Sequence, residues 1–267
     1  MAGESYVIST SEKVSSYYPE TFLVNRGNVW ELGQARNDLF FTETDEEKHF
    51  PNWIKERKII TYMPTHRNFG QLDKEIHQVL DLKRLDEFCR QYGCTFLIKR
   101  HMFSKGKLPR GLEHVVDISQ EKLEPQLLLK YTDILVTDYS SCYTDYLLLN
   151  RPVLFYCYDL DEYLTKSNEM YHDYEEVTPG PKVETFDALL KSLAAAAEGR
   201  DAYEAERNRV LHIFYARENQ GPVAEKQVRH IYKQILRMDP SFLEREGVQK
   251  DRLESSASDV SEGRYVG

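Results

Sequence analysis

The sequence has no long hydrophobic run and few cysteines. No apolar stretch approaches the ~20 residues that a transmembrane helix requires. The opening segment MAGESYVISTSEK lacks the basic region and apolar block of a secretory signal. The four cysteines include no C-x-x-C pair, and no histidine lies at zinc-finger spacing from them. We therefore expect ordinary thiols in a reducing compartment, without a zinc site or a catalytic cysteine.

Positive charge is in the minority. The chain of 267 residues has 35 Lys and Arg against 44 Asp and Glu, a formal net charge of -9. Broad nucleic-acid binding needs a basic footprint, so no nucleic-acid partner is expected. No basic amphipathic membrane anchor is evident either. Net charge says nothing about a single site, so a local basic pocket for a phosphate ligand stays open.

Three common nucleotide and hydrolase motifs are absent. The chain has no G-x-G-x-x-G, no Walker A motif and no G-x-S-x-G. Their absence disfavours NAD binding, a P-loop ATPase and an α/β-hydrolase. Hydrophobic residues make up 41% and charged residues 30%, which indicates a packed core under a solvated surface.

From residue 58 onward, short apolar strands alternate with amphipathic helices. The predicted strands are KIITYM (58–63), CTFLIK (94–99), EHVVDI (113–118), DILVT (133–137) and PVLFY (152–156). The helices predicted between and after them span 71–92, 124–131 and 140–149. This alternation predicts the α/β class, with an open, mostly parallel sheet and helices on both faces. Ligands bind such sheets outside the carboxyl ends of the strands.

The remaining segments are less regular. Residues 1–40 are expected to form a short β/α lead-in and 42–57 a connector or short helix. The segment rich in Tyr, Asp and Glu that ends at residue 181 is expected to be a loop. Three further helices are predicted at 185–198, 201–218 and 222–238. The tail, 239–267, has little apolar content, and its last twenty or so residues are predicted to be disordered.

Cationic side chains follow two of the predicted strands. Thr65 and Arg67 come after the first strand, and Lys99, Arg100 and His101 come after the second. Such groups suit an anionic ligand. Adjacent cations repel one another, and a bound anion such as pyrophosphate would relieve this repulsion. His101 could also donate a proton to a leaving phosphate. The alternative is a pair of solvated turns whose cations pair with surface acids.

The segment TDYSSCYTDY places hydroxyls and acids after the strand at 133–137. Ser140 and Ser141 stand at the N-cap of the predicted helix, whose unpaired N–H groups favour an anion. Asp138 precedes them. Asp145, one turn into the helix, could reach a ribose or polyol hydroxyl, or could simply be an acid favoured by the helix dipole. Capping without any ligand is the simpler alternative for the serines.

Aromatic and acidic residues follow the strand at 152–156. Asp159 and Tyr163 belong to this group, which suits a sugar or polyol but equally suits a well-packed loop. Asp159 and Asp161 resemble a paired-carboxylate metal site, but no third carboxylate lies at a suitable spacing. No metal and no other cofactor is therefore expected.

Taken in order, these segments resemble one family. YMPTHR, LIKRH, TDILVTDYSSCYTDYLLLNRPVLFYCYDLDEY and YHDYEEVTPGP are similar to the CDP-glycerol:poly(glycerophosphate) glycerophosphotransferases, the polymerases and primases of teichoic acids and capsules. STSE and LGQARNDLFF resemble segments near the end of that family's acceptor-side domain. The resemblance runs from about residue 10 to 236.

The resemblance implies a GT-B fold of two Rossmann-like domains. Residues 58–237 would form the domain that binds a CDP-alditol donor, 1–57 a remnant of the acceptor-side domain with a linker, and 238–267 a tail. The family's acceptor domain carries a W-H-G segment, and no WHG occurs here. Most of the acceptor domain is therefore expected to be missing.

The resemblance also assigns roles to individual residues. His101 matches the histidine that contacts the donor pyrophosphate and assists the leaving CMP, although Met102 replaces the usual proline after it. The donor-binding residues implied by the matching segments and by the cationic residues before His101 are Thr65, Arg67, Lys99, Arg100, Asp138, Ser140, Ser141, Asp145, Asp159 and Tyr163.

The implied activity is transfer of an alditol phosphate, glycerol phosphate foremost, from CDP-glycerol or CDP-ribitol to a hydroxyl acceptor with release of CMP. The acceptor would be a polyol phosphate, a glycolipid or a polysaccharide, at the cytoplasmic face of the cell membrane. Two alternatives stay open: a sugar-nucleotide glycosyltransferase of the same fold, and a non-catalytic donor-binding fragment.

Overall fold

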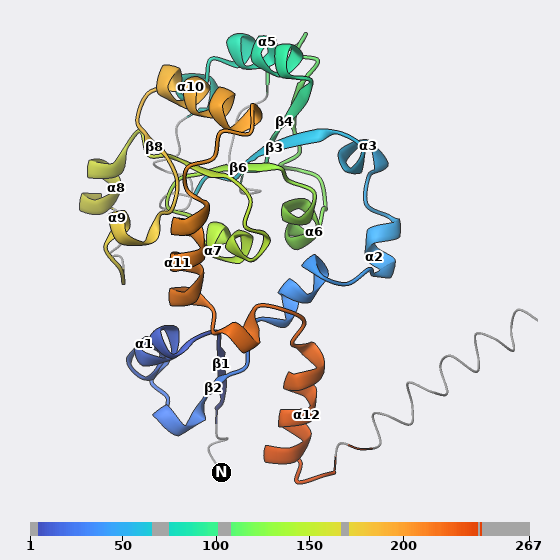
Figure 1. The fold of residues 1–267 in the computed structure, drawn as a ribbon, viewed down its shortest axis with the longest axis vertical. Coiled ribbons are helices and arrows are strands. Elements are labelled where there is room, and N and C mark those ends of the chain that lie inside the picture. The colour runs from blue at the N-terminus through green and yellow to red at the C-terminus, as the bar shows by residue number, and fades with distance from the viewer. Residues whose placement is uncertain (1–4, 66–74, 101–107, 167–170, 240, 242–267) are drawn as a thin grey trace, which may run out of the picture. The chain divides into compact units, whose positions relative to one another are not determined.

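The computed structural model describes residues 5–65, 75–100, 108–166, 171–239 and 241 (Figure 1). Backbone contacts divide the chain into two compact units, Met1–Pro222 and Val223–Gly267. Within the described part of the second unit lies the helix α12 (Ala224–Gln234), where the sequence predicted a helix over 222–238. No helix among the described residues is long and apolar enough to cross a membrane.

A six-stranded parallel sheet forms the centre of the first unit. Its order is β5-β4-β3-β6-β7-β8. The strands are β3 (Lys58–Tyr62), β4 (Cys94–Ile98), β5 (Val115–Asp117), β6 (Ile134–Thr137), β7 (Val153–Tyr156) and β8 (Lys182–Val183). The predicted α/β class and the five predicted strands are confirmed. The two-residue strand β8 was not predicted.

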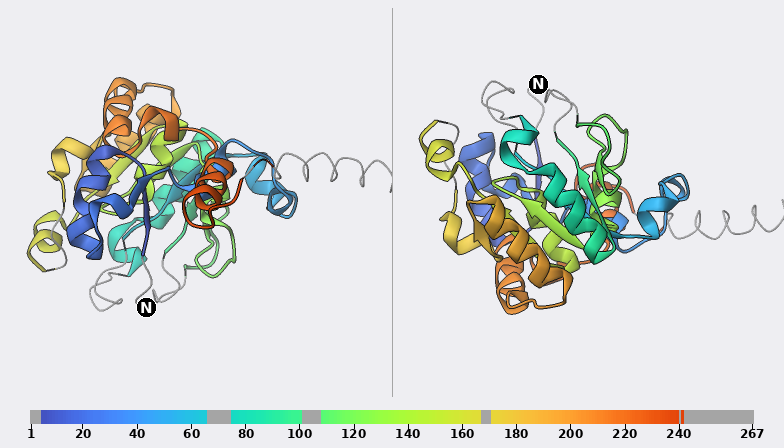
Figure 2. Two further views of the ribbon diagram at one scale, coloured as in Figure 1. Left: turned by 90° about the horizontal axis from the view of Figure 1, so that it is seen from below. Right: turned by 90° about the horizontal axis from the view of Figure 1, so that it is seen from above.

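Helices cover both faces of this sheet (Figure 2). On one face lie α4 (Ile76–Val79), α5 (Leu82–Tyr92) and α10 (Phe186–Ala197), which share a core with alternate residues of the strands. On the other lie α6 (Pro125–Lys130), α7 (Cys142–Tyr146) and α11 (Glu204–Phe214). Covering both faces explains why β4, β6 and β7 are buried along their whole length.

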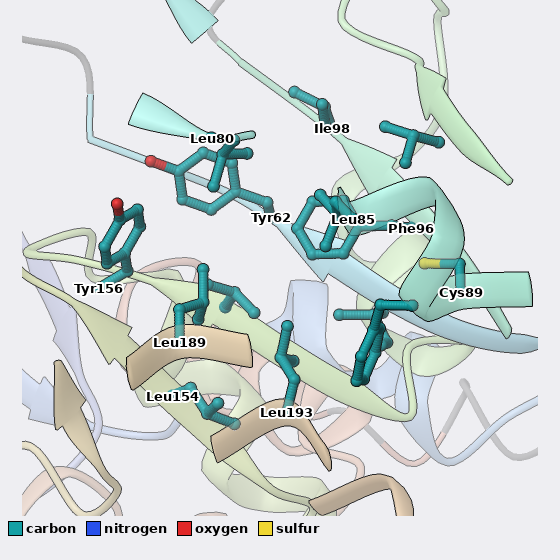
Figure 3. Packing of buried hydrophobic residues seen from close by; sticks show 14 of the residues in the cluster. Tyr62, Leu80, Leu85, Cys89, Phe96, Ile98, Leu154, Tyr156, Leu189 and Leu193 are labelled. Atoms are coloured by element: carbon teal, nitrogen blue, oxygen red, sulfur yellow. The ribbon is translucent and has the colours of Figure 1, made fainter. Parts of the chain in front are cut away.

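The first core shows how the alternation of strand side chains builds a layer. Phe96 points from β4 toward Leu85 of α5, Tyr62 lies on the neighbouring strand β3, and Leu189 and Leu193 of α10 belong to the same core (Figure 3). All five side chains are buried. The apolar residues of α5, which recur three or four positions apart, therefore face the core as the sequence pattern predicted.

The helix predicted over 71–92 is wrong in its middle. Leu80 has an extended backbone (φ -124, ψ 128), which separates α4 from α5. The carboxylate of Asp81 then accepts a hydrogen bond from the Arg84 N–H at 3.2 Å and caps α5. The apolar spacing runs through both pieces, so periodicity alone did not reveal the break. Residues 71–74 lie outside the described part.

The predicted loop before residue 181 contains two short helices. These are α8 (Leu160–Lys166) and α9 (Tyr174–Val177), and the Asp173 carboxylate caps α9 by accepting from the Glu175 N–H at 2.8 Å. The helix predicted at 140–149 ends sooner, because α7 gives way to a 3-10 turn, η4 (Leu147–Leu149).

The N-terminal part forms a small βαβ unit. β1 (Val7–Ser9) and β2 (Val29–Glu31) pair in parallel around α1 (Glu12–Phe22). Thr10 anchors this unit to the segment after α11, because its carbonyl oxygen accepts from the Ala216 N–H at 2.9 Å and from the Asn219 side chain at 3.1 Å. Assignment of residues 1–57 to an acceptor-side remnant stays a prediction.

Short helical turns complete the described elements. They are η1 (Arg26–Asn28), η2 (Ala35–Phe40), α2 (Asp45–Lys48), α3 (Asn52–Lys55) and η5 (Arg217–Asn219). Of these, η2 lies against α6 and reaches the large sheet domain from the small βαβ unit (Figure 1).

Gly180 lies where no side chain fits. A Cβ atom there would lie 2.0 Å from the backbone oxygen of Val153 in β7. Gly180→Ala is therefore expected to force β7 and β8 apart and to cost about 2–3 kcal/mol of the free energy of unfolding. Urea denaturation would measure this. Gly27→Ala is the control, since a Cβ there meets nothing within 4 Å; equal stability of the two variants would contradict the prediction.

Candidate functional site

The strand order creates a switch point between β3 and β6. From β3 the chain proceeds outward to β4 and β5, and from β6 it proceeds the other way to β7 and β8. Loops diverge at such a point and leave a crevice beyond the carboxyl ends of the strands, where open parallel sheets bind nucleotides. The residues that leave β3 and β6 here are 63–65 and 138–141.

Asp138 joins the two loops at the switch point. One oxygen of its fully buried carboxylate accepts from the Thr65 N–H at 2.8 Å, from the Thr65 hydroxyl at 2.7 Å and from the Tyr139 N–H at 2.6 Å. A buried carboxylate is tolerated only when donors satisfy it. Asp138 and Thr65, both predicted from the sequence, are thus brought together, and their contact joins the segments that leave β3 and β6.

An aromatic cluster lies beside them, at the ends of β6 and β7. The Tyr139 ring stacks on Tyr163 with centroids 4.0 Å apart, and its hydroxyl donates to Asp159 at 3.0 Å. The Tyr174 hydroxyl donates to the Asp138 carbonyl oxygen at 3.2 Å. Burial, together with the Asp159 charge, raises the pKa of Tyr139, so this hydroxyl stays protonated and remains a donor. The predicted residues Asp159 and Tyr163 therefore meet around Tyr139, which was not predicted.

Ser140 and Ser141 occupy the turn into α7. Ser141 is the N-cap residue, as expected, but its side chain makes no capping hydrogen bond and is exposed. Its carbonyl oxygen accepts from the Thr144 N–H at 3.0 Å and from the Thr144 hydroxyl at 2.8 Å. The Ser141 hydroxyl is therefore not used to hold its own helix.

Asp145 is enclosed by donors from three other segments. Asp145 is 4% exposed, and its carboxylate accepts from Arg36 Nε at 3.0 Å and lies 2.9 Å from Arg36 Nη2 in an ion pair. Gln126 and Asn37 side chains donate to it at 3.0 Å each, and so does the Tyr215 hydroxyl. This crowding does not favour the predicted contact of Asp145 with a ribose or polyol, which stays a prediction. It makes Asp145 the point where η2, α6, α7 and the end of α11 meet.

Lys99 and Arg100 fold back onto the neighbouring edge of the sheet. Lys99 Nζ donates to the Glu121 carbonyl oxygen at 2.7 Å, and burial lowers the pKa of Lys99. The buried Arg100 guanidinium pairs with Asp117 at 2.7 Å. The alternative of a solvated basic turn is therefore wrong for Arg100. Its contact with a donor stays a prediction.

Two predicted residues lie outside the described part of the chain. These are His101, the predicted catalytic residue, and Arg67, a predicted donor ligand. In the sequence, Arg67 comes five residues after β3 and His101 three residues after β4. Among the residues that are described, no group of three or more His, Cys, Asp or Glu side chains is placed to hold a metal ion.

The residues that sequence reasoning missed are contacts between distant segments. Arg36 and Asn37 belong to LGQARNDLFF, a segment singled out for its resemblance but without a residue assigned. Tyr139 lies in TDYSS between Asp138 and Ser140, both of which were predicted to bind the donor. Gln126 and Tyr215 carried no local signal, because their polar atoms meet Asp145 only in the folded chain.

The chain is similar to proteins of known type. The sequence model of the family described as CDP-Glycerol:Poly(glycerophosphate) glycerophosphotransferase matches residues 2–233. Over 237 residues the chain is 33% identical to the teichoic acid poly(ribitol-phosphate) polymerase of Bacillus spizizenii, covering 84% of this chain and 37% of that protein. Over 235 residues it is 29% identical to the teichoic acid ribitol-phosphate polymerase TarK of Staphylococcus aureus, covering 84% of this chain and 44% of that protein.

A solved structure shows the same fold. The wall teichoic acid polymerase TagF matches with a TM-score of 0.68 and 25% identity, over 79% of this chain and 53% of that chain. The chain spans about two fifths of the length of the two curated relatives.

Proposed function

Since the chain belongs to the CDP-glycerol:poly(glycerophosphate) glycerophosphotransferase family, we propose that it supplies the donor-binding part of an alditol-phosphate transferase. The donor is a CDP-alditol, with glycerol the first candidate and ribitol the second. Relatives named for both kinds of polymer support this substrate class. The product is a polyol-phosphate polymer of the teichoic acid type, made on a polyol-phosphate or glycan acceptor.

The proposed reaction is a phosphoryl transfer. A hydroxyl oxygen of the acceptor attacks the phosphorus that carries the alditol, and a phosphodiester bond forms. The P–O bond to the cytidine phosphate breaks, its electron pair stays on the departing CMP, and the hydroxyl proton is lost. Positioning and balancing of phosphate charge supply most of the catalysis in such transfers.

One observation carries this proposal: Asp138 holds Thr65 at the switch point of the sheet. This contact fixes the two loops between which an open parallel sheet binds a nucleotide. The exposed Ser141 hydroxyl lies at the turn into α7 and makes no capping hydrogen bond. Arg67 and His101, in the adjoining segments, would complete the phosphate site, with His101 protonating or hydrogen-bonding the leaving CMP.

A thermal-shift panel on the 267-residue chain tests the proposal. CDP-glycerol, CDP-ribitol, UDP-sugars and CMP-sialic acid would each be titrated to saturation. A CDP-alditol at a hundred times its Kd is expected to stabilise the fold by about 2.7 kcal/mol. For a domain of this size that corresponds to a rise in Tm of roughly 5–10 °C.

The other outcomes separate the competing functions. Stabilisation only by UDP-sugars or CMP-sialic acid would replace the proposal with a sugar-nucleotide glycosyltransferase. No shift with any nucleotide would identify a fragment that does not bind a donor. The ratio of the Kd values for CDP-glycerol and CDP-ribitol decides which alditol is used.

A further inference from the structure

Arg36 is held at two points by a buried carboxylate, yet more than half of it faces solvent. Its Nε atom donates to one oxygen of Asp145 at 3.0 Å, and its Nη2 atom lies 2.9 Å from the same oxygen in an ion pair. The exposed fraction is 55% for the Arg36 side chain and 5% for that of Asp145. A guanidinium has five N–H donors in a rigid plane, and the contact with Asp145 does not use all of them. The remaining donors have no partner among the residues that the structure describes.

The position of Arg36 follows from both sheets of the first unit. It lies five residues beyond β2, in η2, and so leaves the carboxyl end of the small sheet. Asp145, its partner, lies in α7, which leaves the carboxyl end of β6 in the large sheet. The ion pair therefore joins the segments that follow two parallel sheets, where such sheets present ligands.

Ser141 and Asp145 lie on one face of α7. They are four residues apart, which places their Cβ atoms about 6 Å from each other. Side chains in a helix lean toward its N-terminus, so the Asp145 carboxylate that holds Arg36 leans toward the turn that contains Ser141. Ser141 is exposed at that turn.

Neutralising Asp145 does not account for the exposure of Arg36. Asn37, Gln126 and Tyr215 already donate to both carboxylate oxygens from within the protein. A residue needed only as a counter-charge would be expected to be as buried as its partner, as Arg207 is beside Asp201. Arg36 instead keeps a fixed orientation and an open side.

The positive charge of Arg36 also acts on the Tyr18 hydroxyl. Burial raises the pKa of Tyr18 on α1, and the positive charge of Arg36 partly opposes this rise. The Tyr18 hydroxyl thus stays protonated as a further hydrogen-bond donor near Arg36. Guanidinium and hydroxyl groups donate hydrogen bonds of the kind that a phosphate accepts.

We propose that Arg36 binds the phosphate of an alditol-phosphate group, with Asp145 acting as the positioning residue that orients it. This inference rests on the proposed function, since it assumes a polyol-phosphate substrate at the same crevice. The phosphate belongs either to the CDP-alditol donor or to the terminal unit of a polyol-phosphate acceptor. Both present the same tetrahedral anion to the guanidinium.

Calorimetric titration of the full chain with CDP-glycerol and, separately, with glycerol 3-phosphate tests this assignment. Arg36→Gln is expected to raise the Kd of at least one of these ligands about tenfold or more. Arg36→Lys, which keeps the charge but loses the two-point attachment to Asp145, is expected to fall between Arg36→Gln and the wild type. Arg90→Gln is the control, because Arg90 is an exposed arginine that pairs with Glu87 on its own helix. The Kd values of this variant are expected to match those of the wild type.

The outcomes separate this inference from the proposed function. Loss of affinity confined to CDP-glycerol assigns Arg36 to the donor, and loss for glycerol 3-phosphate assigns it to the acceptor. Unchanged Kd values in Arg36→Gln, with binding by the wild type intact, overturn the role of Arg36 alone. Absence of CDP-alditol binding in the wild type overturns the proposed function and this inference with it. If Arg36→Gln lowers Tm, the comparison is decided on Arg36→Lys.

Discussion

Replacing Asp138 with alanine is expected to cost about 3 kcal/mol or more of the free energy of unfolding and to abolish CDP-alditol binding. The Asp138 carboxylate is fully buried and accepts three hydrogen bonds, two from Thr65 and one from the Tyr139 N–H. Alanine would leave two backbone N–H groups without this acceptor. The loops after β3 and β6 would then separate at the switch point of the sheet. Urea denaturation measures the first effect, and a thermal shift with CDP-glycerol measures the second.

Two further variants make this result specific. Asp138→Asn keeps one acceptor oxygen and is expected to lose less stability than alanine. Asp187→Ala removes a carboxylate that is 77% exposed and paired with Arg84 at 2.8 Å, so its cost is expected to stay below about 0.5 kcal/mol. If Asp138→Ala were as stable as Asp187→Ala, the two loops would not depend on this carboxylate.

The sheet was predictable because its signal is local. Each strand is a short apolar run stopped by a polar or turn residue, and burial on both faces requires such runs. The strands at 58–62, 94–98, 134–137 and 153–156 all followed from this pattern. The strand β8 did not, because two residues, Lys182 and Val183, are too few to show any pattern.

Helix boundaries were less predictable, because capping competes with periodicity. Apolar spacing continues from Ile76 through Leu82, yet Asp81 caps a new helix at that point. A side chain that can cap a helix can also sit within one, and the choice depends on tertiary packing. The helix α7 also ends sooner than predicted, after Tyr146, where a 3-10 turn follows.

The candidate site was predictable where it is built from residues adjacent to strand ends. Thr65, Asp138, Asp159 and Tyr163 were found this way, and the structure places them near one another through direct contacts and through Tyr139. The Asp145 network was not predictable, since Arg36 is 109 residues away along the chain. No local pattern in a single sequence carries such a pairing.

Arg207→Met is expected to lower the free energy of unfolding by about 1.5–3 kcal/mol, because the Asp201 carboxylate and the Asn150 oxygens lose their hydrogen bonds from a buried guanidinium. The Arg207 side chain is 2% exposed, and its Nη1 and Nη2 atoms lie 2.9 and 2.5 Å from the Asp201 carboxylate. Its Nε donates to the Asn150 side chain at 3.1 Å, and Nη2 donates to the Asn150 carbonyl oxygen at 3.2 Å. The Arg207 guanidinium thus connects α11 to Asp201, which precedes this helix, and to Asn150, which follows η4. Urea denaturation at pH 7 measures the loss, and Arg90→Met, in an exposed pair, is the control.

The pH dependence of stability distinguishes this ion pair from packing of the arginine stem. The hydrogen bond from Arg207 holds the pKa of Asp201 below its usual value, against the opposing effect of burial. A lowered folded-state pKa stabilises the fold fully above the unfolded value of about 3.9. This stabilisation is lost as the pH falls through the folded pKa. The stability difference between the wild type and Asp201→Asn is therefore expected to stay constant from about pH 5 to 8 and to shrink below about pH 4. A difference that persisted unchanged into acid would assign the effect to shape and hydrogen bonding instead of charge.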